Sequence, residues 1–146
     1  MVIKRIKERH LVVMFVVILA GALSFFLQAA PKNDEKAENG ELEAIELFLT
    51  SRGSPLRGYG RVFLDAAKEN GLDWMILPAI CWKASWCGRD AAAMALKNPF
   101  ALRLKKKGLI RFSSVTASIF AAAKVVKKKY KGLPPKQILL LYDGRF

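Results

Sequence analysis

The sequence predicts a mainly helical (α+β) domain with one small β-hairpin, preceded by an N-terminal transmembrane helix. Three observations lead to this prediction. An uncharged run of twenty residues, 11–30, follows a basic N-terminus. Apolar residues recur three and four positions apart through most of residues 47–146, as on amphipathic helices. Two short alternating runs around a glycine-ended turn interrupt that pattern.

The N-terminal segment has the features of a membrane anchor. Residues 1–10 carry four basic side chains against one acid, which predicts a cytoplasmic basic segment. Residues 11–30 are long enough to cross about 30 Å of hydrocarbon, and the domain behind them is then extracytoplasmic. The alternative is secretion after cleavage of a signal peptide. The apolar run is longer than the usual core of about 7–15 residues, and a good cleavage site is lacking, so we favour a retained anchor.

Charge divides the rest of the chain. Residues 31–46 have a net charge of −4 and predict an acidic linker whose first half stays unfolded. Residues 47–146 carry 19 Lys and Arg against five acids, a net charge of +14. A positive net charge of this size favours an anionic partner: a wall polymer, lipid headgroups or extracellular nucleic acid. A basic surface that only keeps the domain soluble is the alternative.

The predicted helices follow from periodicity and caps. They are Glu41–Thr50, Tyr59–Asn70, Asp73–Cys87, Ser113 or Ser114 to Lys131, and Pro134 or Pro135 to Tyr142. Gly71 is expected as a left-handed cap and Asp73 as the N-cap of the helix after it. Pro78 falls at the fifth position of that helix and predicts a kink. Residues 89–100 predict a loop, and residues 101–104 and 109–112 predict the hairpin.

The helix predicted from Asp73 to Cys87 is apolar on two opposite sides. One side carries Leu77, Ile80, Cys81, Ala84 and Cys87, and the other carries Pro78, Trp82 and Trp86. Its only charge between Asp73 and Gly88 is Lys83. A helix with apolar residues all round is expected to be surrounded by protein.

Cys81 and Cys87 are the chain's two cysteines. On one regular helix they would be about 9 Å apart along the axis, beyond the limit of roughly 7 Å between Cα atoms for a disulfide. We therefore expect two buried thiols, since a bridge would require the helix to unwind before Cys87. The single histidine, His10, precedes the membrane segment. No metal site and no cofactor are expected.

Residues 78–88 also resemble the active-site helix of bacterial lysozyme-like glucosaminidases, the family of mannosyl-glycoprotein endo-β-N-acetylglucosaminidase-like domains. The family pattern is Pro-Ala-Ile-x-x-x-Glu-Ser-x-x-Gly, and this chain reads Pro-Ala-Ile-Cys-Trp-Lys-Ala-Ser-Trp-Cys-Gly. Further matches, such as Ser54-Pro-Leu, Gly71-Leu-Asp and Asn98-Pro-Phe, extend the resemblance over residues 47–142. The resemblance implies a lysozyme-like fold for residues 47–146 and β-1,4-linked peptidoglycan glycan as the partner.

Ala84 stands at the position of the family's catalytic Glu. A methyl group cannot protonate a leaving oxygen, and loss of a general acid commonly costs about 10²- to 10⁴-fold in rate. Asp65, Glu69, Asp90 and Asp143 are poorly placed to replace it. The family's Asn-Pro-aromatic-Gly loop has Ala101 at its Gly position, which favours natural degeneration of the site over a deliberate substitution at Ala84.

The resemblance suggests five residues for glycan binding: Ser85, Trp86, Asn98, Phe100 and Tyr130. Each has a structural alternative, as a core side chain or as a loop or helix cap. Two Lys runs, 105–107 and 127–129 with Lys131, are not interleaved with stacking aromatics, which argues against nucleic-acid binding. The prediction is a membrane-anchored domain that binds peptidoglycan with impaired catalysis. The alternatives are an active hydrolase with an unrecognised acid and a basic module for wall polyanion or extracellular DNA.

Overall fold

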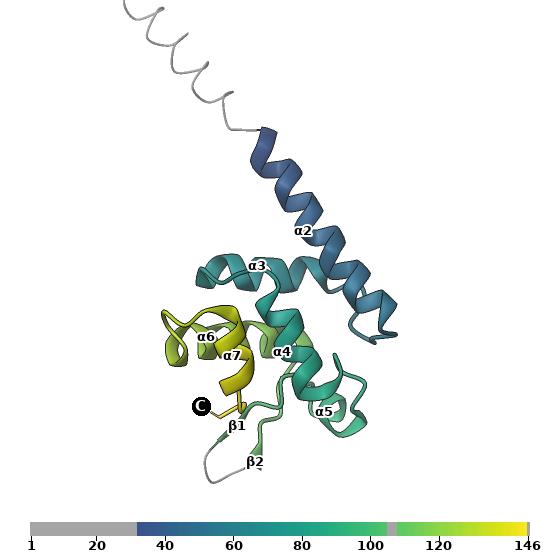
Figure 1. The fold of residues 1–146 in the computed structure, drawn as a ribbon. Coiled ribbons are helices and arrows are strands. Elements are labelled where there is room, and N and C mark those ends of the chain that lie inside the picture. The colour runs from purple at the N-terminus through teal and green to yellow at the C-terminus, as the bar shows by residue number, and fades with distance from the viewer. Residues whose placement is uncertain (1–31, 105–107, 146) are drawn as a thin grey trace, which may run out of the picture. The chain divides into compact units, whose positions relative to one another are not determined.

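The structure, a computed structural model, describes residues 32–104 and 108–145 (Figure 1). The described chain is mainly helical with one two-stranded antiparallel sheet, as predicted. The elements in chain order are α2 Lys32–Ser51, α3 Gly60–Asn70, α4 Ile76–Ser85, α5 Ala91–Ala95, β1 Arg103–Leu104, β2 Gly108–Leu109, α6 Val115–Lys129 and α7 Pro135–Leu141. Residues Glu38–Phe146 form one compact unit, which is described below.

Helix α2 corrects the linker prediction. Residues 31–46 were expected to be unfolded in their first half, yet the helix begins at Lys32 and passes through the predicted boundary at residue 47. Asp34 and Glu35 lie in its first turn, where carboxylates interact favourably with the helix dipole. The Glu, Lys and Ala residues of the segment are strong helix formers, and they outweigh a cost of about 1 kcal/mol for Gly40.

Glu38 joins α2 to α3. Its carboxylate forms ion pairs with Arg61 and Lys68, and the hydrogen bonds from these two side chains lower the pKa of Glu38. Further along α2, the carboxylate of Glu46 accepts hydrogen bonds from the backbone amides of Gly58 and Gly60, at the beginning of α3. A carboxylate at the N-terminus of a helix satisfies amides that have no partner within the helix.

Helix α4 packs against α3, α6 and α7 (Figure 1). Leu77, Ile80 and Cys81 are completely buried, which confirms the predicted core face. The helix begins at Ile76, two residues later than an N-cap at Asp73 predicts. Pro78 therefore lies in the first turn, where a missing amide proton removes no intrahelical bond, and the reason given for a kink no longer applies. The carboxylate of Asp73 accepts from the amide of Met75 in the turn before the helix.

The loop predicted at residues 89–100 contains a short helix, α5. Asp90 caps it, because its carboxylate accepts a hydrogen bond from the amide of Ala93 at 3.0 Å. The hairpin is shorter than predicted: Arg103 pairs with Leu109, and Leu104 with Gly108. Ser114, one of the two predicted caps, caps α6 by accepting from the amide of Ala117.

No helix in the described ranges is both long and apolar enough to span a membrane. The predicted cytoplasmic segment, residues 1–10, and the predicted anchor, residues 11–30, lie outside those ranges. Both stay predictions.

Candidate functional site

Ala84 is half-buried near the C-terminal end of α4. Its neighbour Ser85 is buried, donates a hydrogen bond to the carbonyl of Pro99 at 2.5 Å, and accepts one from the amide of Gly88 at 2.9 Å. Ser85 thus joins the end of α4 to the loop before the hairpin. Both bonds of the Ser85 hydroxyl are made inside the protein.

The end of α4 differs from the predicted end at Cys87. The helix stops at Ser85, and Trp86 and Cys87 both adopt left-handed backbone conformations, with φ of 53° and 52°. The amide of Trp86 still donates to the carbonyl of Trp82. This reversal of the chain places Trp86 outside the helix, where 60% of the side chain is exposed.

Trp86 belongs to a surface group of four side chains, the aromatic–arginine cluster, which consists of Phe48, Arg52, Trp82 and Trp86. The rings of Trp82 and Trp86 meet edge to face at 4.7 Å between centroids, and Phe48 meets Trp82 in the same way at 6.5 Å. The Arg52 guanidinium lies over Trp82 at 4.3 Å and over Phe48 at 4.6 Å. An exposed indole held by a second ring is a suitable surface for stacking a sugar ring.

Asn98 and Phe100, two of the predicted glycan contacts, are buried side chains. Asn98 is 0% exposed; its amide donates to the carbonyls of Leu102 and Ile110 and accepts from the amide of Leu102, at 2.8–2.9 Å. Phe100 is also completely buried and packs against Phe63 at 6.0 Å between ring centroids. Both side chains are part of the interior that holds the hairpin.

Tyr130, the fifth predicted contact, is buried at the end of α6 and donates its hydroxyl to the carbonyl of Leu141. It lines a cavity of about 420 Å³ between the ends of α3 and α6 and the beginnings of α4 and α7. Neither Ala84 nor Trp86 lines that cavity. Of the predicted residues, Trp86 is exposed and Ala84 is half-buried, whereas the other four are buried.

Three of the four carboxylates named as possible replacements for the missing acid, Asp65, Asp90 and Asp143, have partners elsewhere. Asp90 caps α5, and Asp65 lies 3.9 Å from Arg61. Asp143 accepts from Lys129 at 2.8 Å, and this bond, with those from Arg145, holds its pKa well below the usual range. An acid with a lowered pKa is ionised near neutral pH and cannot donate a proton there.

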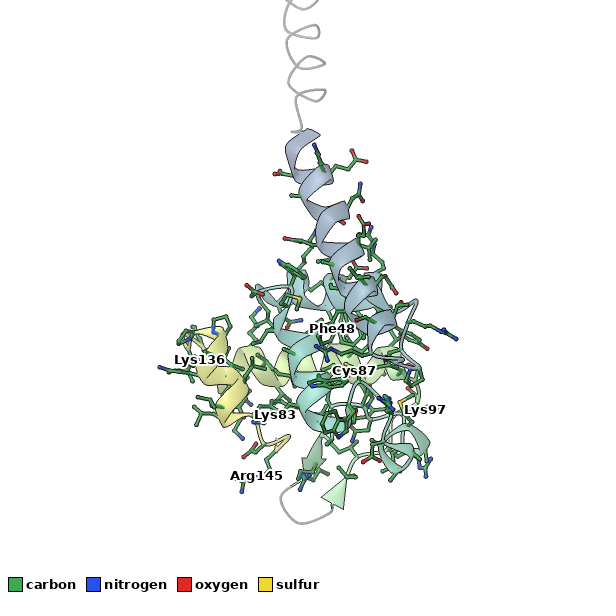
Figure 2. The ribbon with its side chains drawn as sticks, turned by 45° about the vertical axis from the view of Figure 1, so that its right-hand side comes forward. Phe48, Lys83, Cys87, Lys97, Lys136 and Arg145 are labelled. Carbon is green, nitrogen blue, oxygen red and sulfur yellow. The ribbon has the colours of Figure 1, made fainter. Side chains whose placement is uncertain are left out.

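Lys83 has a role that the periodicity did not reveal. Its ammonium donates to the carbonyls of Leu139, Leu140 and Tyr142 at the C-terminal end of α7 (Figure 2). These carbonyls have no partners within the helix, and a cation interacts favourably with the dipole there. The signal in the sequence was a single charge on an otherwise apolar helix.

Cys81 and Cys87 are buried free thiols, as predicted. The separation of about 9 Å expected for a continuous helix does not apply, because the helix ends before Cys87. Within residues 32–104 and 108–145, no group of three or more His, Cys, Asp or Glu side chains is arranged to hold a metal ion.

No protein-family model matches the chain, and neither curated proteins nor solved structures give a match. The family resemblance accordingly stays a prediction based on the residues quoted above.

Proposed function

We propose that the chain is a membrane-anchored, extracytoplasmic lysozyme-like domain of the glucosaminidase type, which binds peptidoglycan glycan strands without cleaving them efficiently. The observation that carries the proposal is that Trp86, two residues after Ala84 at the position of the family's general acid, has an exposed indole.

The chemistry of this pair favours binding over hydrolysis. A glycosidic bond breaks slowly unless an acid protonates the leaving oxygen, and the methyl group of Ala84 has no proton to give. Trp86 retains an exposed aromatic surface that can stack on a pyranose ring, and Trp82 fixes its orientation. A site of this kind can still bind the sugar ring through Trp86, although it lacks the acid that would protonate the glycosidic oxygen.

The test uses the full-length chain in detergent with purified peptidoglycan and measures both sedimentation with the polymer and release of reducing sugar. We expect the unmodified chain to bind without release, and Ala84→Glu to release sugar. Ala84→Gln is the matched control, because it has nearly the same size without an acidic proton. Trp86→Ala should weaken binding, whereas Leu140→Ala, which truncates a side chain that is 70% exposed on α7, should not.

Two results would count against this function. Sugar release by the unmodified chain would show an active hydrolase with an unrecognised acid. Absence of binding by the unmodified chain would exclude the glycan as its partner.

A second candidate, a basic module for anionic wall polymer, is favoured by the net charge of +14 on residues 47–146. Basic surfaces attract polyanions at long range, and salt weakens that attraction steeply. Stripping teichoic acid from the peptidoglycan separates the candidates. Binding to the stripped polymer that survives about 0.3 M salt supports glycan contact, whereas binding that needs the wall polymer and disappears at that salt supports the polyanion module.

A further inference from the structure

The turn that ends α4 is strained. Trp86, Cys87 and Gly88 have φ values of 53°, 52° and 80°, and only the last is a glycine. A left-handed conformation is unfavourable for a non-glycine residue, because its Cβ approaches the carbonyl oxygen. Two such residues in succession persist only where surrounding contacts impose them, and such strain is commonly found at functional positions.

The strained turn brings the backbone of Cys87 next to the backbone of Cys81. The amide of Cys87 donates to the carbonyl of Cys81 at 3.1 Å, a bond that spans the whole turn. A helix continued through Cys87 would instead carry the two residues about 9 Å apart along its axis. The conformation of residues 86–88 therefore removes the geometric objection to a bridge between these cysteines.

The two thiols share one buried site. Both side chains are 0% exposed, and the sulfur atoms lie 3.8 Å from the carbonyl oxygens of Pro99 and Pro78 respectively. Burial and a hydrogen bond with Cys87 raise the pKa of Cys81, while the same hydrogen bond lowers the pKa of Cys87. In the folded chain, Cys87 is therefore the more acidic of the two thiols.

We propose that Cys81 and Cys87 are a disulfide site, and that the bond locks the turn that presents Trp86. The oxidant is a small-molecule or protein disulfide. The thiolate of one cysteine attacks one sulfur of the oxidant, which forms a mixed disulfide and expels one thiolate. The thiolate of the other cysteine then attacks the sulfur of the first and expels the second. The two released thiolates take up the protons lost by the cysteines, and the oxidant gains two electrons.

Burial determines when this chemistry takes place. In the folded chain neither sulfur is accessible to an oxidant or to a reductant, so the bond forms while α4 is still closing and is protected afterwards. An exported domain folds where such bonds persist. The disulfide does not depend on glycan binding, and its test uses only the thiols and the fold.

The test starts from the full-length chain in detergent, denatured and fully reduced. One sample refolds with a mixture of oxidised and reduced glutathione, and the other with excess reductant. Each sample is then denatured in the presence of N-ethylmaleimide, which alkylates free thiols, and the mass of the chain is measured by mass spectrometry. Because the chain has two cysteines, we expect no adduct in the first sample and two in the second. Two adducts after oxidising refolding, or a disulfide-linked dimer, would overturn the proposal.

Thermal unfolding gives an independent readout. Closing a loop of this size should raise the Tm of the oxidised chain by on the order of 10 °C over the reduced chain. The Cys81→Ala/Cys87→Ala variant should show the same Tm in both buffers. A bond that forms but lowers the Tm, or leaves it unchanged, would show that the turn is not arranged for a disulfide.

Discussion

Replacement of Asn98 by Ala should destabilise the domain by about 3–4 kcal/mol. The change removes three hydrogen bonds of 2.8–2.9 Å inside a completely buried site. The amide of Leu102 then has no partner, which costs about 1–3 kcal/mol for a buried donor. The carbonyls of Leu102 and Ile110 lose one bond each, at about 0.5–1.5 kcal/mol; the loss is partial for Leu102, which still accepts from the amide of Ile110.

Asn70→Ala is the matched control. Asn70 is also buried, but its side chain makes one hydrogen bond, to the carbonyl of Ala66 within α3. Its loss should cost no more than about 1 kcal/mol, since alanine is also the better helix former. Urea unfolding followed by circular dichroism measures both free energies, provided that the m-value is unchanged. Equal losses for the two variants would refute the structural role assigned to Asn98.

Three further substitutions test other parts of the structure. Ala101→Gly should stabilise the domain by about 0.5 kcal/mol, measured as a higher Tm, because Ala101 has φ of 50° and glycine adopts that conformation freely at some entropic cost. Lys83→Met should lower the free energy of unfolding by about 1–2 kcal/mol in urea, because it removes the cation from the end of α7. Asp143 has a pKa lowered by Lys129, so its contribution to stability is complete above the ordinary Asp pKa, about 4, and is lost as the pH falls below it. Asp143→Asn should therefore flatten the decline in Tm on acidification; an unchanged decline would contradict the ion pair.

The sequence predicted the elements whose signals are local. The apolar periodicity of α3 and α6, the Ser114 cap and the left-handed Gly71 all follow from neighbouring residues, and all were confirmed. The extension of α2 was missed because Glu, Lys and Ala are typical both of charged linkers and of exposed helices. Composition alone does not separate these two outcomes.

The candidate site was harder to predict, because contacts distant in sequence decide it. Asn98 and Phe100 lie on a loop, and loops are usually exposed, yet the side chains of both are interior. The end of α4 was placed two residues late because nothing local favours a left-handed Trp86 or Cys87. Ser85, Pro99 and Cys81 impose that turn through hydrogen bonds that form only when the domain packs.

The bonds from residues 139–144 to the middle of the chain bear on the order of folding. Lys83 holds the end of α7, the hydroxyl of Tyr142 donates to the carbonyl of Phe100, and the carbonyl of Gly144 accepts from the amide of Arg103. Before this segment has docked, α4 and the hairpin lack the hydrogen bonds that it makes to them. Contacts this distant in sequence form slowly. Until the segment after Pro134 has docked, the domain therefore stays incompletely packed and its two thiols remain accessible to an oxidant.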